Sequence, residues 1–247
     1  MAEPDTREFA LPTGEARRSR WGRAVSWPFA TKRRRWVVVA VAGCLALVVG
    51  GVLVWPDAAR LVPGTLQAGV LPADEVSAIV GTALRSEEGV SEPPPALRAE
   101  PAECAAVVGP MTRSVYGDGW TAFWAVAHQE SEAVADHVVT QVVARYPDRG
   151  RAEAVFRTLG TGVTECRSAV RVGSDEHTSP KWFYAVDART SDAVAWTAVQ
   201  QTGDAWACHR RVRVVDDVVV QVAVCQAGDG KRAATEIADR VVARVGS

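Results

Sequence analysis

The chain has 247 residues, a formal net charge of −1 and a hydrophobic fraction of 48%, so it is long enough for one globular domain and a membrane anchor. Residues 1–35 carry nine Lys/Arg and four Asp/Glu, which leaves 19 basic and 25 acidic residues in the rest of the chain. Binding to phosphates needs a basic surface, so we expect no nucleic-acid partner for that larger part.

Residues 1–55 predict a tail and a membrane span. Residues 1–35 are basic and lack periodicity, which indicates a disordered tail. Residues 36–55 (WVVVAVAGCLALVVGGVLVW) carry no charge, and a helix of that length matches a hydrocarbon core about 30 Å thick. Basic residues 32–35 precede this run, so we predict a single-pass cell-membrane protein that contacts lipid through residues 36–55, with a cytoplasmic N-terminus and an extracytoplasmic C-terminal domain.

Two alternatives apply to the apolar run. A cleaved signal peptide has a shorter apolar core and a small-residue cleavage site, whereas this run ends in Trp-Pro. The sequence Val41–Cys44 resembles a bacterial lipobox, but eleven further apolar residues follow Cys44. We interpret Cys44 as a small apolar residue inside the helix, and its lipidation stays an open alternative.

Residues 56–69 are expected to link the span to a domain of residues 70–247. Pro72 and two acidic residues open a predicted helix whose apolar face repeats at helical spacing from Val76 to Ala83. Residues 91–101 (SEPPPALRAEP) indicate a surface loop. Strands are expected at residues 113–116, 120–128 and 137–146, the first two flanking Gly117-Asp118-Gly119.

The second half of the domain repeats this alternation. A helix is expected to start at Pro147-Asp148 and to end near residues 160–162. Strands should follow, and Asp229 should cap a last helix whose one side carries Ala234, Ile237, Ala238, Val241 and Val245. Those strands are predicted at residues 182–187, 194–201, 209–215 and 218–224. The order of elements predicts an α+β fold, an antiparallel sheet with flanking helices.

Four cysteines in the outer part indicate two disulfides, since an extracytoplasmic compartment is oxidising. Asp216-Asp217 forms the obvious two-residue turn of a hairpin, and opposed residues in such a hairpin have numbers that sum to 433. Cys208 and Cys225 meet this condition at a non-hydrogen-bonded site, where Cα atoms are about 4.5 Å apart. Cys104 and Cys166 are then left to pair.

The remaining chemistry-bearing residues form no catalytic or metal motif. The histidines at 128, 137, 177 and 209 lie in no GxSxG or HExxH pattern, and no CxxC or HxxxH spacing indicates zinc. We therefore expect neither an enzyme nor a cofactor. Tyr116, Trp120 and Gln141 are candidate ligand-binding residues because aromatic and polar side chains line small-molecule pockets, although the aromatic residues could equally be core and the glutamine could face water.

Several segments together resemble the PknH-like extracellular sensor domain of actinobacteria. They are VLPADEVSAIVG at 70–81, PAEC at 101–104, SVYGDGWTAF at 114–123, HVVTQVVARYPDRGRAEAVF at 137–156, WACHRRVRVVDDVVVQVAVC at 206–225, and the closing AATEIADRVVARV. The most specific of these are the Cys-to-Cys hairpin and the YxxGW segment.

The resemblance implies a membrane-tethered domain with two disulfides, an antiparallel sheet and a cleft for an unidentified ligand. Some members are the outer half of a receptor Ser/Thr kinase, but residues 1–35 are too few for a kinase domain. We therefore expect an extracytoplasmic sensor without its own kinase, which binds a small envelope-derived ligand or a partner protein. A structural or accessory envelope protein is the alternative.

Overall fold

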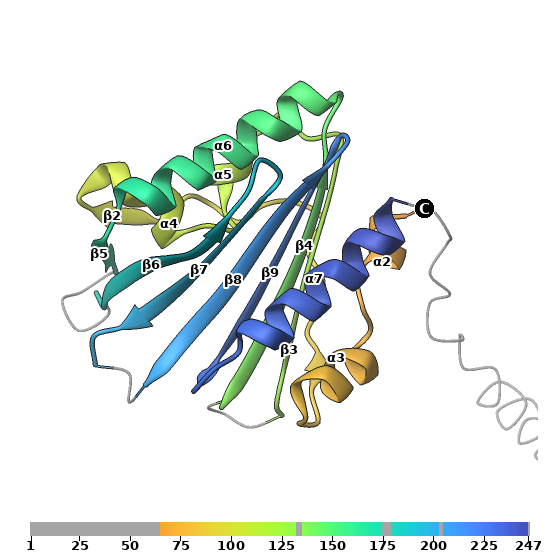
Figure 1. The fold of residues 1–247 in the computed structure, drawn as a ribbon, viewed down its shortest axis with the longest axis horizontal. Coiled ribbons are helices and arrows are strands. Elements are labelled where there is room, and N and C mark those ends of the chain that lie inside the picture. Colours follow the sequence, from red (N-terminus) through yellow and green to blue (C-terminus); the bar gives the residue numbers. More distant parts are fainter. Residues whose placement is uncertain (1–64, 132–134, 174–178, 203–204, 247) are drawn as a thin grey trace, which may run out of the picture. The chain divides into compact units, whose positions relative to one another are not determined.

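Nine antiparallel strands form one sheet in the part of the chain that the structure describes (Figure 1). The structure is a computed structural model that describes residues 65–131, 135–173, 179–202 and 205–246. The strand order is β1-β3-β4-β9-β8-β7-β6-β5-β2. The strands are β1 (Arg85–Ser86), β2 (Arg98–Glu100), β3 (Ala122–Gln129), β4 (His137–Arg145), β5 (Ser168–Val172), β6 (Lys181–Arg189), β7 (Ala193–Gln200), β8 (Trp206–Val215) and β9 (Val218–Ala227).

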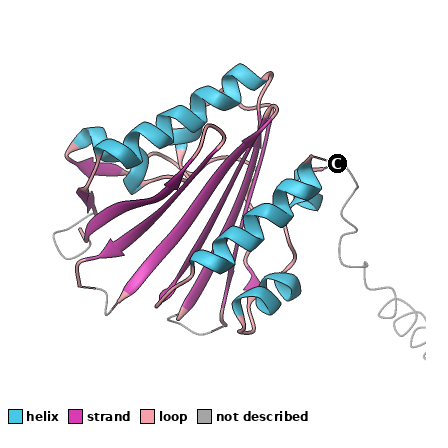
Figure 2. Ribbon diagram, in the orientation of Figure 1, coloured by secondary structure: helices cyan, strands magenta, loops and turns pink. Residues whose placement is uncertain are grey.

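Helices cover both faces of this sheet (Figure 2). They are α2 (Leu66–Gly69), α3 (Ala73–Val80), the 3₁₀ turn η1 (Ala102–Cys104), α4 (Ala105–Val108), α5 (Arg113–Tyr116), α6 (Arg149–Glu165) and α7 (Lys231–Val245). The long helix α6 packs on β6, β8 and β9, and α7 packs on β8 and β9. The predicted α+β class with flanking helices is confirmed for this domain.

The two faces of the sheet belong to two separate hydrophobic cores. Successive side chains of a strand point to opposite faces, and β9 shows this with buried residues on both. Val219 and Ala223 belong to the core under α6, which we call the α6 face. Val220 and Val222 belong to the core under α7, which we call the α7 face, together with Ile237. β9 is therefore a central strand buried on both sides.

The β8–β9 hairpin has the predicted register. Asp216 lies in the left-handed region of φ/ψ space at φ 50°, which Asp tolerates better than most residues. Cys208 pairs with Cys225 across the ladder, and the two form a disulfide with Cα atoms 3.9 Å apart. Cys104 and Cys166 form the second disulfide, with Cα atoms 5.7 Å apart. Both predicted pairings are confirmed.

The prediction of a strand at residues 113–116 was wrong, since this segment is the short helix α5. The Thr112 hydroxyl accepts a hydrogen bond from the Ser114 N–H, and Gly117 at φ 56° ends the turn. A capping side chain before the segment and a glycine after it favour one helical turn over an extended chain. The helix predicted to begin at Pro72, α3, was correct in type.

The expected end of α6 near residues 160–162 was also wrong, because the helix continues to Glu165. A Cβ atom at Gly162 would lie 3.2 Å from Cβ of Ala106 in α4. Gly162 therefore permits the close approach of α4 to α6 and does not end the helix. A glycine inside a helix is destabilising in isolation, and here tertiary packing overrides that tendency.

Other boundaries differ from the expectations in smaller ways. The expected loop at residues 91–101 contains β2, which pairs with the unpredicted strand β5. The expected linker at residues 56–69 contains α2, whose Leu66 is buried in the core of the α7 face. The N-cap of α7 is Gly230, although Asp229 Oδ1 still accepts a hydrogen bond from the Lys231 N–H at 2.9 Å.

The predicted tail at residues 1–35, the span at residues 36–55 and Cys44 lie outside the described residues. No helix in the described ranges is long and apolar enough to cross a membrane. The described residues from Thr65 onward belong to one compact unit.

Candidate functional site

Tyr116, one of the predicted ligand-binding residues, is buried in the core of the α6 face with 1% of its surface exposed. Its hydroxyl donates a hydrogen bond to Gln221 Oε1 in β9 at 2.8 Å. Its backbone carbonyl accepts a hydrogen bond from the Tyr146 hydroxyl at 3.2 Å. Burial, with a smaller contribution from Tyr146, holds the pKa of Tyr116 well above its ordinary value. Tyr116 is therefore a neutral hydrogen-bond donor.

Trp120 lies on the same face as Tyr116, and Phe123 contacts both rings. The Phe123 ring centroid is 5.3 Å from that of Tyr116 and 6.1 Å from that of Trp120. The indole Nε1 of Trp120 is buried without a hydrogen-bond partner among the described residues. The structure thus brings two of the three predicted site residues together.

Gln141 lies on the α7 face, away from the other two predicted site residues, and its amide is used within the protein. Its Oε1 accepts a hydrogen bond from the Leu71 N–H at 2.8 Å, and its Nε2 donates to the Leu71 carbonyl at 2.9 Å. The same Nε2 lies 2.8 Å from His128 Nε2, so this ring nitrogen must accept. Gln141 therefore fastens the segment before α3 to the sheet.

A group that was not predicted, Arg210, lies at the centre of the α6 face. It is two residues from Cys208 in β8 and shares its face, and its register partners are Trp196 in β7 and Ala223 in β9. Its Nη1 is buried without a hydrogen-bond partner, and no ion pair to Arg210 exists among the described residues. Arg210 as a whole is only partly buried, but burying a guanidinium nitrogen without a partner is costly, so this position needs an explanation beyond packing.

The electrostatics of Arg210 involve two tyrosines and no carboxylate. Burial lowers the pKa of Arg210 to about 10, while Tyr184 and Tyr116 act in the opposite direction. Burial raises the pKa of Tyr184 to about 12, and Arg210 opposes this shift. At neutral pH the guanidinium is therefore charged and faces two neutral hydroxyl groups.

Two further donors near Tyr116 and Arg210 are also unsatisfied. Gln221 is fully buried, and because its Oε1 accepts from Tyr116, its Nε2 is left without a partner in the described part of the chain. The indole Nε1 of the fully buried Trp196 is likewise unpaired there. We call Tyr116, Tyr184, Trp196, Arg210 and Gln221 the Arg210 cluster. Its free hydrogen-bonding groups are mainly donors, and its net charge is positive.

A signal in the sequence could have located this cluster. Cys208 and Cys225 must face the same side of the hairpin to form a disulfide, and side chains in a strand alternate. Arg210 is two residues after Cys208, and Gln221 is four residues before Cys225. The alternation therefore places both polar residues on the buried side that the disulfide defines.

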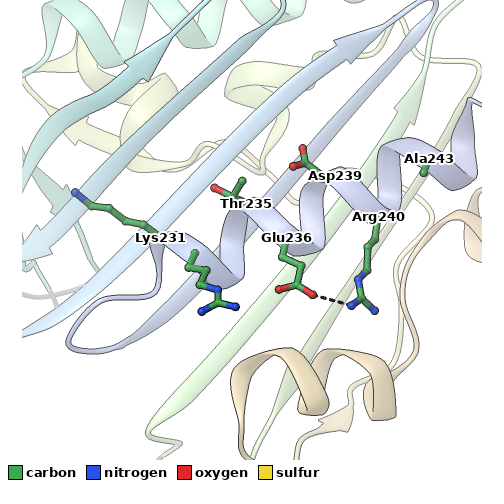
Figure 3. Close-up of a pocket in the computed structure, with 7 residues that line it drawn as sticks. Lys231, Thr235, Glu236, Asp239, Arg240 and Ala243 are labelled. Atoms are coloured by element: carbon green, nitrogen blue, oxygen red, sulfur yellow. Dashed lines mark hydrogen bonds and ion pairs between the residues drawn. The ribbon is translucent and has the colours of Figure 1, made fainter.

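The hollows on the domain surface are weaker candidates. One of about 670 Å³ follows the outer side of α7 and is lined by Lys231, Arg232, Thr235, Glu236, Asp239, Arg240 and Ala243 (Figure 3). Its charges are largely paired, since Glu236 binds Arg240, and Lys231 and Asp239 bind residues of the sheet. A second hollow of about 500 Å³ lies between α3 and α7, lined by apolar residues such as Ile79 and charged ones such as Arg232. Neither contains an unpaired buried charge.

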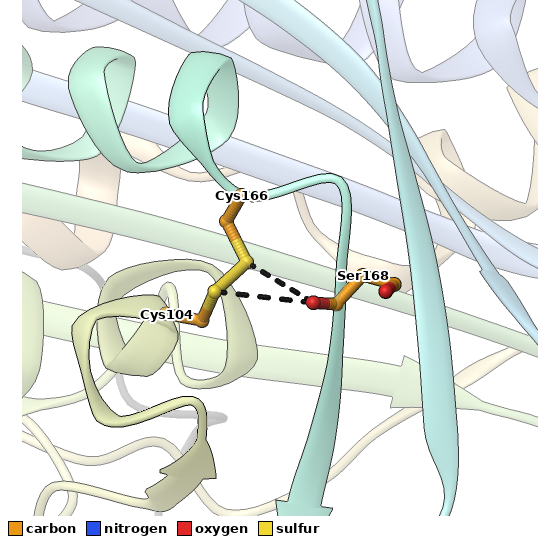
Figure 4. Close-up of a disulfide and its surroundings, with 3 residues drawn as sticks. All are labelled: Cys104, Cys166 and Ser168. Carbon is orange, nitrogen blue, oxygen red and sulfur yellow. Dashed lines mark hydrogen bonds between the residues drawn. A yellow bond between two sulfur atoms is a disulfide. The ribbon is translucent and has the colours of Figure 1, made fainter.

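The Cys104–Cys166 disulfide joins η1 to the C-terminal end of α6 (Figure 4). Its two sulfur atoms lie 4.0 and 3.6 Å from the Ser168 carbonyl oxygen, and both cysteines are buried in the core of the α6 face. This disulfide ties the helices over the α6 face to β5. The described residues contain no group of three or more His, Cys, Asp or Glu side chains that could hold a metal ion.

The comparisons with known proteins agree with this fold. The family model of the PknH-like extracellular domain matches residues 61–244. The serine/threonine-protein kinases PknH of Mycobacterium bovis and Mycobacterium tuberculosis are each 25% identical to this chain over 232 residues, which cover 85% of this chain. Those residues cover only 38% and 36% of the two kinases, so the chain spans well under half of the curated relatives that it matches.

A solved structure has the same fold. The crystal structure of the extracellular domain of PknH from Mycobacterium tuberculosis aligns with a TM-score of 0.66 at 22% sequence identity. The alignment covers 73% of this chain and 94% of that domain. Because the family match covers most of the chain and includes both disulfides and every described strand, the chain belongs to the PknH-like extracellular domain family.

Proposed function

We propose that this protein is a membrane-tethered sensor whose extracytoplasmic domain binds a small ligand of the cell envelope and catalyses no reaction. The observation that carries the proposal is the Arg210 cluster, in which the buried Nη1 of Arg210 and two further buried donors, Trp196 Nε1 and Gln221 Nε2, have no partner in the described structure. Such groups are normally satisfied in a folded protein. A ligand that supplies acceptors would satisfy them.

The membership of the chain in an extracellular domain family supports the extracytoplasmic location. Residues 36–55 would be the single span, and residues 1–35 would be cytoplasmic. A C-terminal alkaline phosphatase fusion tests this topology, because the enzyme is active only outside the cytoplasm. An active fusion is expected, and an inactive one contradicts the proposed orientation.

Ligand binding is tested with the purified full-length protein in a non-ionic detergent. Lipid and cell-wall extracts of actinobacterial envelopes should raise the melting temperature of the domain, because a ligand that binds only the native state stabilises it. Heat-treated cytosol serves as the matched control extract. If no envelope extract raises the melting temperature, the proposed sensor function is wrong.

A partner-protein role is the second candidate, and one observation favours it. Phe183 and Val199 oppose each other on β6 and β7, and they are 44% and 38% exposed. Their neighbours Tyr184 on β6 and Ala198 on β7 belong to the core of the α6 face. Because side chains alternate along a strand, Phe183 and Val199 point away from that face. Crosslinking in cells through a photoreactive residue at position 183 should then capture one protein, and a matched probe at the exposed Asp216 should not.

A further inference from the structure

We propose that the Arg210 cluster binds an oxyanion, a carboxylate or a phosphate, that is carried by an apolar body. This inference rests on the proposed ligand-binding function and names the chemistry of the ligand. It concerns the α6 face of strands β6, β7, β8 and β9.

The first step is the mismatch of charge around Arg210. The described residues supply no carboxylate to it, in contrast to Arg213 in the same strand, which pairs with Asp192 and Asp239. Arg213 lies on the α7 face, three residues away. The strand therefore carries a paired arginine, Arg213, on the α7 face, where the buried Nε of Arg211 also has no partner among the described residues, and Arg210 without a carboxylate on the α6 face.

The second step is the chemistry of the neighbouring groups. Gln221 Nε2 and Trp196 Nε1 can only donate hydrogen bonds, and both are buried and unpaired in the part of the chain described. The hydroxyl of Tyr116 already uses its O–H to donate a hydrogen bond to Gln221 Oε1. A guanidinium together with unpaired N–H donors matches an anionic acceptor, because charge-assisted hydrogen bonds to carboxylate and phosphate are the strongest that arginine makes.

The third step concerns the rest of the ligand. Half-buried apolar side chains continue the same face beyond Arg210, among them Val138, Trp182, Val186 and Trp206. Trp206 lies four residues before Arg210 on β8, which corresponds to about 13 Å along the strand. The same face of the sheet therefore offers donors for a charged group at Arg210 and apolar side chains toward Trp206.

The experiment measures the binding of four probes to the full-length protein in phosphatidylcholine nanodiscs, by isothermal titration. The probes are hexyl phosphate, hexanoate, inorganic phosphate and hexanol. We expect hexyl phosphate and hexanoate to bind at least ~10-fold more tightly than hexanol, which corresponds to one strong charged contact. If inorganic phosphate binds as tightly as hexyl phosphate, the ligand is a free anion and the apolar body is not needed. If inorganic phosphate binds much more weakly than hexyl phosphate, the ligand is an amphiphile such as a lipid.

Variants locate the contact. Arg210→Met removes the charge at similar volume and should abolish the preference for anions over hexanol. Arg211→Met is the matched control, because it removes the same charge from the next residue on the opposite face, and it should keep the preference. If Arg210→Met does not fold by circular dichroism, Arg210→Gln replaces it with a polar side chain.

Two results would overturn the inference. The first is equal binding of hexanol and hexanoate, or no probe binding at all, to the wild-type protein. The second is an unchanged anion preference in the Arg210 variant. If envelope extracts still stabilise the protein in either case, the proposed sensor function stands and only the oxyanion assignment fails.

Discussion

Gln141 provides the sharpest test of how the domain holds its N-terminal segment. Gln141→Leu keeps the side-chain volume but removes every hydrogen bond of the amide. The N–H and carbonyl of Leu71 and the Nε2 of His128 then lose their partners. Leu71 and Gln141 have no exposed surface and His128 has 1%, so water cannot replace the amide without a local opening of the structure.

The magnitude follows from the number of groups left unpaired. Each buried unsatisfied group costs about 1–3 kcal/mol, and such costs add incompletely. We expect Gln141→Leu to lower the free energy of unfolding by about 3–5 kcal/mol. At about 2–4 °C per kcal/mol for a domain of this size, the melting temperature should fall by roughly 10–15 °C.

The assay compares urea unfolding of residues 60–247 with hydrogen exchange at the Leu71 amide. The matched control is Gln129→Leu, because Gln129 also lies on a strand but donates to the exposed Glu87 side chain, and its loss should cost less than about 1 kcal/mol. Exchange at Leu71 should accelerate only in the Gln141 variant. Equal destabilisation by the two substitutions, or unchanged exchange at Leu71, would refute the proposed fastening role.

Three further predictions concern other groups. Replacing both Cys208 and Cys225 by Ala should lower stability by about 3 kcal/mol, because the bridge closes a 17-residue separation, and a change below 1 kcal/mol by urea unfolding would contradict this. Tyr116→Phe deletes the bond to Gln221 and should cost about 1–2 kcal/mol by the same assay, whereas a stabilised variant would show that this bond contributes nothing. Burial lowers the pKa of His128, so the native state disfavours the imidazolium. Its contribution is complete above about pH 6.5 and is lost as the pH falls toward the lower native value. His128→Gln should flatten the stability profile between pH 7 and 5, and an unchanged slope would exclude His128 as its source.

Arg210 shows why part of the site escaped sequence-based prediction. Aromatic and glutamine side chains were chosen for their type, and Tyr116 and Trp120 do lie together. Gln141 lies on the opposite, α7 face of the sheet, because side chains alternate along β4 and its neighbour Val142 occupies the α6 face. Arg210 was overlooked within the run of arginines in β8, where charge alone suggests solvent exposure. Only strand alternation, counted from Cys208, places Arg210 on the α6 face and its equally half-buried neighbours Arg211 and Arg213 on the α7 face.

The sequence by itself determined the features that depend on local pattern. Alternation and turn residues located the long strands and the β8–β9 hairpin, and the hairpin geometry determined both disulfide pairings. The fold class followed from the order of these elements. These features rest on interactions between residues close in the chain, so a single sequence contains the necessary information.

Only the tertiary structure decided the features that depend on contacts across the sheet. The edge strand β2 and its neighbour β5 are too short for a clear alternation and exist because β5 pairs with β6 and β2 pairs with β5. Helix α6 passes through Gly162 because α4 packs against it. The Arg210 cluster joins α5 with four separate strands, and no local pattern specifies which polar groups from distant segments lose their partners when the two cores close.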